Sequence, residues 1–179
     1  MSPDHQYAPE PPEFTAGALR RAQAVAFDLP IVAGWVVFSG LVGGLLRLLE
    51  LDFDTPTAWD VYAFTTLVLP VALTFAFFEA SQRQATPGKR RLRIRVVDAI
   101  GNRLTHGRSL ARSAVKFAPW QLAHTAVFQL VAGSTATVYV VLALGAQLLV
   151  LASAITMSLD SHHRAFHDLV ARTRVVEGD

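Results

Sequence analysis

One carboxylate lies inside a long apolar stretch near the start of the chain. Residues 24–46 form a run of about 23 residues, roughly 35 Å of helix, which is long enough to cross a bilayer core. The run carries one charge, Asp28, followed by Pro30. A carboxylate in a membrane span costs on the order of 3 kcal/mol and marks a functional-site hypothesis. Its chemistry would be the binding of a cation or proton on a transport path, and a kink at Pro30 would add the carbonyl oxygen of Ala26 as a ligand.

An arginine stands at the mouth of the same predicted helix. Arg21 precedes Asp28 by seven residues, so the two share a helix face about 10 Å apart along the axis. Helical side chains point toward the N-terminus, so Arg21 points away from Asp28 and each needs another partner. We expect Arg112 or Arg164 beside Asp28. The alternative to a transport site is a structural ion pair that locks the first helix to the cytoplasmic segments.

The elements that must position these residues are membrane helices. The chain is 52% hydrophobic and 17% charged, with a mean hydropathy of +0.36, and its apolar residues fall into long runs. This composition indicates an integral membrane protein with spans at residues 24–46, 61–78, 115–132 and 136–157. Pro70 should interrupt the second span, and Glu79 closes it. The third span is the most polar, and an interfacial helix is the alternative there.

A strongly basic segment separates the second and third spans. It holds ten Lys and Arg residues: Arg83, Lys89, Arg90, Arg91, Arg93, Arg95, Arg103, Arg108, Arg112 and Lys116. Pro87-Gly88 indicates a helix stop, and the alternation in residues 91–96 indicates a strand. A turn at residues 98–102 and a return strand from Arg103 would complete a hairpin within residues 83–112. The C-terminal segment, residues 158–179, ends in strand-like sequence that should pair with this hairpin.

The distribution of basic residues predicts the topology. With four spans, 15 of the 16 Lys and Arg residues, all except Arg47, lie on one face. The positive-inside rule then places both termini in the cytoplasm, including residues 1–15, a polar and proline-containing tail that we expect to be disordered. The basic face should contact anionic lipid headgroups at about 1 kcal/mol per residue, rather than nucleic acid.

Other chemistries find little support in the sequence. The absence of Cys removes disulfides, thiolate metal sites and thiol nucleophiles. His163 and His167 are four residues apart and could chelate a metal, but no third ligand is evident, so we expect no metal and no cofactor. Pro87-Gly88-Lys89 lacks the preceding glycine of a phosphate-binding loop. No nucleophile and base are recognisable, so an enzyme is not expected.

Four motifs together resemble the RDD family of small bacterial membrane proteins, which is named for one arginine and two aspartates. Their order and spacing cover most of the chain from Ala16 onward. They are Arg21 with Asp28, Thr86-Pro87-Gly88-Lys89-Arg90, Leu110-Ala111-Arg112, and the segment from Arg164 through His167-Asp168 to Val176. Arg172 departs from the pattern, since the family commonly has a small residue there.

The resemblance implies which residues form the site. The family triad would be Arg21, Asp28 and Asp168, and Asp168 is then the expected partner of Arg21. Supporting residues would be Arg112, Arg164, His167, Pro30, Glu79 and Lys89. Transport of ions or small solutes is the usual proposal for the family, with cation/proton exchange suggested for some members.

These observations predict an all-α membrane protein with four transmembrane helices and a small cytoplasmic β-hairpin or sheet as a cap. Residues 16–179 would form one membrane domain in the bacterial plasma membrane. The first functional hypothesis is a transporter, or transport subunit, for a cation or small solute that uses Asp28, with a homo-oligomer completing the path. The second is a non-catalytic scaffold or accessory protein in which the triad is a structural ion-pair staple.

Overall fold

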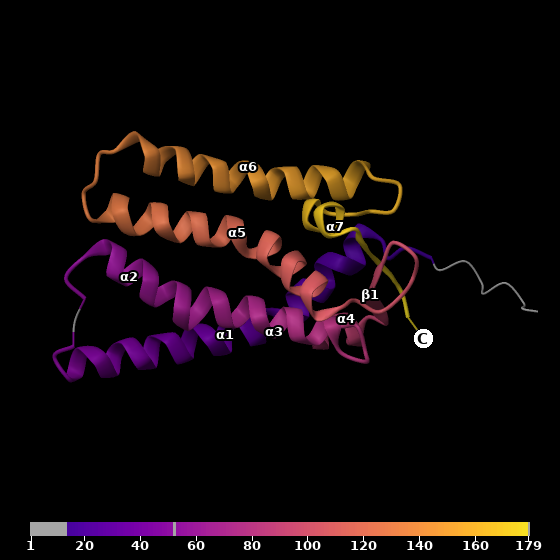
Figure 1. Cartoon of the computed structure of the whole chain (residues 1–179), viewed down its shortest axis with the longest axis horizontal. Helices are drawn as coiled ribbons and strands as arrows, with labels where there is room; N and C mark the ends of the chain where they lie inside the picture. The colour runs from indigo at the N-terminus through magenta and orange to yellow at the C-terminus, as the bar shows by residue number, and fades with distance from the viewer. Residues whose placement is uncertain (1–13, 52, 179) are drawn as a thin grey trace, which may run out of the picture.

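The chain passes four times along the length of a helical bundle (Figure 1). This computed structural model describes residues 14–51 and 53–178. The second pass is one continuous helical rod built from three pieces. The passes are α1 (Ala18–Leu48), then α2 (Pro56–Ala63), η1 (Phe64–Val68) and α3 (Leu69–Ala80), then α5 (His106–Val131), and finally α6 (Thr137–Leu159).

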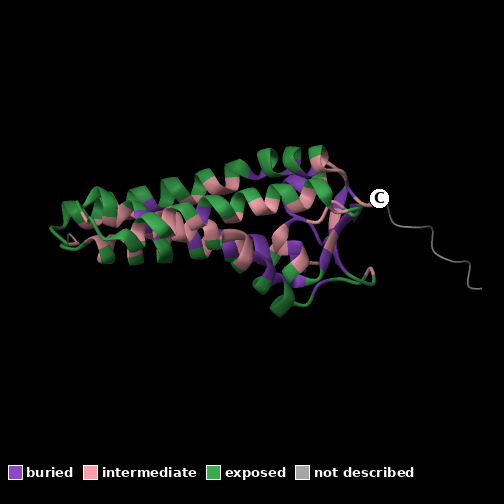
Figure 2. Cartoon of the chain, turned by 90° about the horizontal axis from the view of Figure 1, so that it is seen from above, coloured by how far each residue is buried: buried purple, intermediate pink, exposed green. Residues whose placement is uncertain are grey.

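Short elements form a cap at one end of the bundle, beside the start of α1 (Figure 1). They are α4 (Pro87–Arg91), β1 (Ile94–Asp98), α7 (Phe166–Ala171) and β2 (Thr173–Glu177). Buried residues gather at this end, whereas the long helices turn mostly exposed side chains outward (Figure 2). The cap is therefore the packed core of the protein, and the long bundle presents an apolar exterior.

Three of the described helical segments are long and apolar enough to cross a membrane. They are α1, the rod Pro56–Ala80, and α6, and few residues in the apolar windows of α1 and α6 are buried. Outward apolar side chains are what a lipid environment requires. The helix α5 is not among the three, because it carries more polar residues, so the span expected at residues 115–132 remains a prediction.

The interruption expected at Pro70 takes a different form. The helix continues through Pro70, and the irregularity lies one turn earlier in η1, a π-helical turn. There the N–H of Leu69 donates to the carbonyl of Phe64, five residues back. A π turn absorbs the mismatch that a proline, which has no N–H, introduces into the helix. The hydroxyl of Thr66 in η1 also contacts the Ser39 hydroxyl of α1 at 2.8 Å.

The cap contains a two-stranded sheet that joins distant parts of the sequence. β1 pairs with β2 in antiparallel register, with Val96 opposite Val175, which confirms the expected pairing of the C-terminal segment. The predicted return strand of the hairpin is wrong in extent, since Arg103 makes only one bridge to Val97. The reason is local: Thr105 caps α5 by accepting a hydrogen bond from the N–H of Arg108, so the chain turns helical at once.

The start of the described chain falls within the segment expected to be a tail, residues 1–15. Residues 1–13 lie outside the described part of the chain, but Phe14 and Thr15 belong to the cap. The carbonyl of Phe14 accepts a hydrogen bond of 2.8 Å from the N–H of Glu177, and Thr15 bridges to Val176. The start of the described chain thereby lies along β2, immediately before α1 begins.

Candidate functional site

The buried carboxylate of α1 is held at the start of α4. Asp28 is 2% exposed. Its Oδ2 accepts a hydrogen bond from the Thr86 hydroxyl at 2.5 Å, and its Oδ1 accepts one from the N–H of Gly88 at 2.7 Å. The expectation that Arg112 or Arg164 would pair with Asp28 is therefore wrong. Because α4 brings a hydroxyl and a free backbone N–H to this point, two neutral donors serve the carboxylate instead of an arginine.

The Thr86-Pro87-Gly88 motif is a helix start rather than the predicted helix stop. Thr86 is the N-cap of α4, and Pro87 occupies the first helical position, where its missing N–H costs nothing. Gly88 follows because a Cβ there would lie 2.2 Å from the carbonyl oxygen of Ala24 and 2.8 Å from Oδ1 of Asp28. Only a glycine lets α4 approach the backbone of α1 this closely.

The expected partnership of Arg21 with Asp168 is confirmed. One guanidinium nitrogen of Arg21 forms an ion pair with Asp168 Oδ2, and the other donates to the carbonyl of His163. Both charged side chains are almost completely buried. This contact ties the first turn of α1 to α7.

Arg112 extends this pair into a network. Its Nε and Nη2 donate to Asp168 Oδ1 at 2.9 and 2.7 Å, and its Nη1 forms an ion pair with Glu79. Glu79 in turn pairs with Lys89. The order Arg21–Asp168–Arg112–Glu79–Lys89 alternates in charge and takes one residue each from α1, α7, α5, α3 and α4. We call these five residues the buried charge network.

Asp168 is the most heavily used acceptor of the network. Besides the two arginines, it accepts the N–H of Ala165 and the hydroxyl of Thr173, both at 3.1 Å. Burial by itself would raise the pKa of Asp168, but Arg112 and Arg21 outweigh burial and hold the pKa well below its usual value. The carboxylate is therefore ionised throughout the ordinary pH range.

Three supporting residues, Arg164, Pro30 and His167, lie outside the network. Arg164 makes a bidentate pair with Asp160, at 3.0 and 2.7 Å, and its side chain is 37% exposed. Pro30 and Ala26 are exposed while Asp28 is buried, so they lie on a different face of α1. The extra carbonyl ligand that a kink at Pro30 would bring beside Asp28 is consequently not part of this site.

His167 borders the network from α7. Its Nε2 lies 3.8 Å from Asp168 Oδ2, and its side chain is 14% exposed. Burial lowers the pKa of His167 to about 3, and the positive charge of Arg112 acts in the same direction. The imidazole is thus neutral at pH 7. Within residues 14–51 and 53–178, no group of three or more His, Asp or Glu side chains is arranged to hold a metal ion.

Sequence reasoning missed the partners of Asp28 and the pairing of Glu79 with Lys89. A signal for the first was present, since a threonine before Pro-Gly is typical of a helix N-cap. No local signal predicts the second, because Glu79 and Lys89 flank a connection whose path depends on the cap.

The fold and this site define a small helical membrane protein whose cap is fastened to its helices by buried charges. A model of the RDD family matches residues 15–172, and the chain belongs to the RDD family, whose members are membrane proteins. The match includes Arg21, Asp28, Asp168 and every other member of the network. No curated protein and no solved structure matches the chain significantly.

Proposed function

We propose that this protein is a non-catalytic membrane scaffold or accessory protein in which Arg21, Asp28 and Asp168 form a structural staple. The observation that supports the proposal is that the carboxylates already have hydrogen-bond partners within the chain. Each oxygen of Asp28 and of Asp168 accepts at least one hydrogen bond from a donor of the chain itself. A fully satisfied polar network makes a fold unique and rigid.

Cation transport through Asp28 is the competing function. A carboxylate that carries a cation needs oxygen lone pairs free for the ion and a path for water to reach it. Asp28 is 2% exposed, and each of its oxygens already accepts one hydrogen bond, from a hydroxyl and from a backbone N–H. These contacts favour the staple. Neither hypothesis requires an enzyme, and we propose that the protein has no catalytic activity of its own.

We also propose that α5 crosses the membrane as a fourth span. Three of its polar side chains form hydrogen bonds with the neighbouring helix α2. Gln121 and Thr125 donate to the two carboxylate oxygens of Asp60 at 2.9 and 2.7 Å, and Gln129 donates to the Thr57 hydroxyl at 3.0 Å. Polar groups satisfied between helices are tolerated inside a bundle, so low hydropathy does not exclude a span here.

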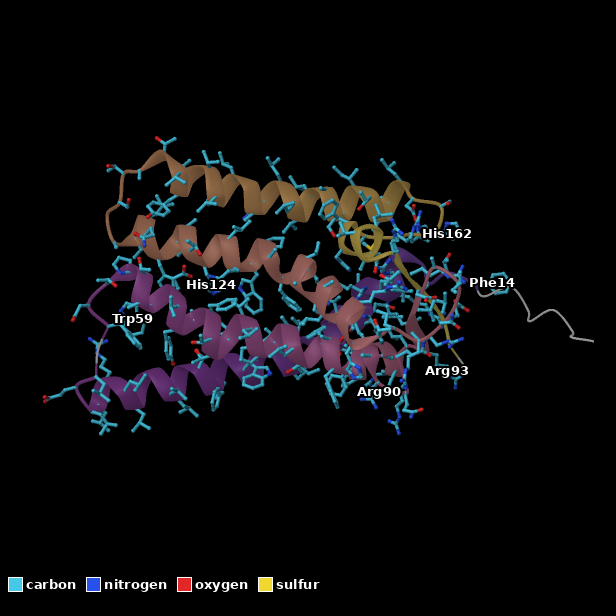
Figure 3. The ribbon with its side chains drawn as sticks, viewed as in Figure 1. Phe14, Trp59, Arg90, Arg93, His124 and His162 are labelled. Carbon is cyan, nitrogen blue, oxygen red and sulfur yellow. The ribbon has the colours of Figure 1, made fainter. Side chains whose placement is uncertain are left out.

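A fourth span supports a cytoplasmic cap in the bacterial plasma membrane. Four crossings return the chain to its starting side, and all 16 Lys and Arg residues except Arg47 are then at or near the cap. Arg90 and Arg93 lie at the cap end, whereas Trp59 lies at the far end, as expected for an interfacial aromatic residue (Figure 3). Anionic headgroups are the nearest partners for this basic end, and the apolar outer faces of α1 and α6 fit lipid or a second copy of the chain.

Flux and folding measurements together test the proposed function. Wild type, Asp28→Asn and the exposed-loop control Asp54→Asn are reconstituted in proteoliposomes with an internal pH-sensitive dye, and Na⁺, K⁺ or Li⁺ gradients are imposed. The staple predicts no cation-dependent proton movement in wild type and a lower melting temperature for Asp28→Asn alone, because the amide keeps one acceptor oxygen but sets its NH2 group against one of the two donors. Proton movement in wild type that an equally stable Asp28→Asn lacks would overturn the staple and establish exchange.

A further inference from the structure

A cavity of about 520 Å³ lies where the bundle meets the cap. It is bounded by α1, α5, α6 and α7, and it is partly open to the surroundings. Within the described residues, α1 packs against α3, α4 and η1 but makes little contact with α5 or α6. The space between α1 and α6 is consequently a lateral opening, and its volume falls in the range of about 300–1,000 Å³ typical of ligand sites.

The cap side of the cavity is basic. Arg21, Lys89, Arg112 and Lys116 line it, together with the neutral imidazole of His167. The acids paired with these cations in the buried charge network are Glu79 and Asp168. Asp28 also acts electrostatically on Lys116, so four cations face three carboxylates and one positive charge is in excess. An apolar, partly closed space makes such an excess more attractive to an anion than it would be in water.

Lys116 is the cation of this set that lies outside the ion pairs. Its ammonium nitrogen lies 4.1 Å from the centroid of the Phe75 ring and 5.2 Å from that of Phe117. None of the described carboxylates forms an ion pair with it, and the residue is only half-buried. Aromatic rings orient an ammonium group but accept none of its hydrogen bonds in the way an anionic oxygen does. Its N–H donors therefore remain available to a bound group.

The remaining walls are apolar and follow α6 away from the cap. They include Val25 of α1, Val115 of α5, and Leu149, Val150 and Met157 of α6. From Met157 to Leu149 the wall extends about 12 Å along the helix. A basic end joined to an elongated apolar wall matches a molecule with an anionic head and a hydrocarbon tail. A small soluble anion would leave this wall unfilled.

We propose that the cavity binds one membrane lipid with a phosphate headgroup, with the phosphate at Lys116 and an acyl chain between α1 and α6. A phosphate monoester carries a charge of about −1.5 to −2 near pH 7, so it is attracted to the excess positive charge of the cavity. The lipid site goes beyond the proposed staple. It can be tested separately, because Lys116 takes no part in the buried charge network.

Lipid binding to the purified full chain tests this site. Delipidated protein in a neutral detergent is titrated with dioleoyl phosphatidic acid, dioleoyl phosphatidylcholine or inorganic phosphate, and bound lipid is counted by native mass spectrometry alongside the melting temperature. We expect one phosphatidic acid per chain, bound at least tenfold more tightly than phosphatidylcholine, and no stabilisation by inorganic phosphate at matched concentration. Equal binding of the two lipids would overturn the proposal. Equal stabilisation by inorganic phosphate would show an anion site without a lipid tail and would also overturn it.

Matched variants separate the cavity from diffuse attraction to the basic surface. Lys116→Met and Arg83→Met each remove one positive charge, but Arg83 is exposed and outside the cavity. Lys116→Met should weaken phosphatidic acid binding by about tenfold or more, the loss of one charge-assisted hydrogen bond, while Arg83→Met changes it less than twofold. Ser153→Trp fills the cavity from α6 without changing any charge of the protein, and it should abolish lipid binding. Equal losses in Lys116→Met and Arg83→Met, or full binding by Ser153→Trp, would contradict the site.

Discussion

The backbone N–H of Gly88 donates to Oδ1 of Asp28 at 2.7 Å, across 60 residues of sequence. The contact exists because glycine lets α4 lie against the backbone of α1, where a Cβ would come within 2.2 Å of the carbonyl oxygen of Ala24. Asp28 and Gly88 together hold α1 against α4, and we call this contact the α1–α4 joint. The joint fixes the basic end of the cap to the first helix.

Gly88→Ala should disrupt this joint without altering any charge. The added methyl group collides with backbone rather than with a movable side chain, so α4 must shift away from Asp28. We expect a loss of about 2–4 kcal/mol of unfolding free energy, in the range of overpacking plus one lost hydrogen bond to a charged group. Thermal unfolding in detergent measures it.

Gly107→Ala is the matched control for this substitution. A Cβ at Gly107 meets nothing within 4 Å, and the residue lies near the start of α5. Alanine is a better helix former than glycine, so the melting temperature should stay the same or rise slightly. If both variants unfold at the wild-type temperature, the tight joint between α4 and α1 is contradicted.

Arg112→Met should be among the most damaging single substitutions. Arg112 is 1% exposed and joins Glu79 to Asp168, so its loss leaves two buried carboxylates short of a cation. Removing one partner of a buried ion pair typically costs about 3–5 kcal/mol. The comparison is Arg164→Met, which breaks the partly exposed pair with Asp160 and should cost at most about 1 kcal/mol. Similar denaturation midpoints for the two variants would refute a stabilising network.

Stability should decrease as the pH falls below the ordinary pKa of histidine. His167 is neutral in the folded protein because its pKa is lowered to about 3 by burial and by the facing charges of Arg112, Lys116 and Arg21, against the attraction of Asp168. The unfolded chain binds a proton near pH 6.5, so between about pH 6.5 and 3 the unfolded state holds more protons. The loss approaches about 1.4 kcal/mol per pH unit for this single group.

Two variants isolate the contribution of His167 to this profile. His167→Gln should flatten the dependence of unfolding free energy on pH above pH 4, whereas His162→Gln, at an exposed position near the cap (Figure 3), should leave it unchanged. Below about pH 4 both should still lose stability, because the depressed pKa of Asp168 makes its contribution disappear on acidification. An unchanged slope in His167→Gln would contradict a buried neutral imidazole.

The fourth crossing can be tested by labelling, since the natural chain contains no cysteine. Ser134→Cys lies between α5 and α6, and Ser161→Cys lies between α6 and α7. If α5 spans the membrane, a membrane-impermeant thiol reagent labels position 134 in intact cells, but position 161 only after permeabilisation. Labelling of position 134 only after permeabilisation would place α5 at the interface.

The three most hydrophobic helices were predictable because each contains a long run of apolar residues. The pairing of the C-terminal strand and the Arg21–Asp168 contact were also accessible, because charge distribution and motif order bring both ends of the chain to one face. The partners of Asp28 could not be predicted in the same way. They depend on whether Pro87-Gly88 ends one helix or begins another, and both readings satisfy the local rules until the tertiary path is known. The partners of Gln121, Thr125 and Gln129 in α5 were not predictable for a related reason, since they lie on α2 across the bundle.

The ion pair between Arg21 and Asp168 joins residues 147 positions apart. During synthesis, α1 emerges long before the segment that carries Asp168, so Arg21 has no acidic partner of the network until α7 is made, whereas Arg112 can already pair with Glu79. We expect the cap to close only after α7 and β2 have been synthesised. A chain that stopped before Asp168 would leave Arg21 without its carboxylate partner and the cap without the contact that joins α7 to α1.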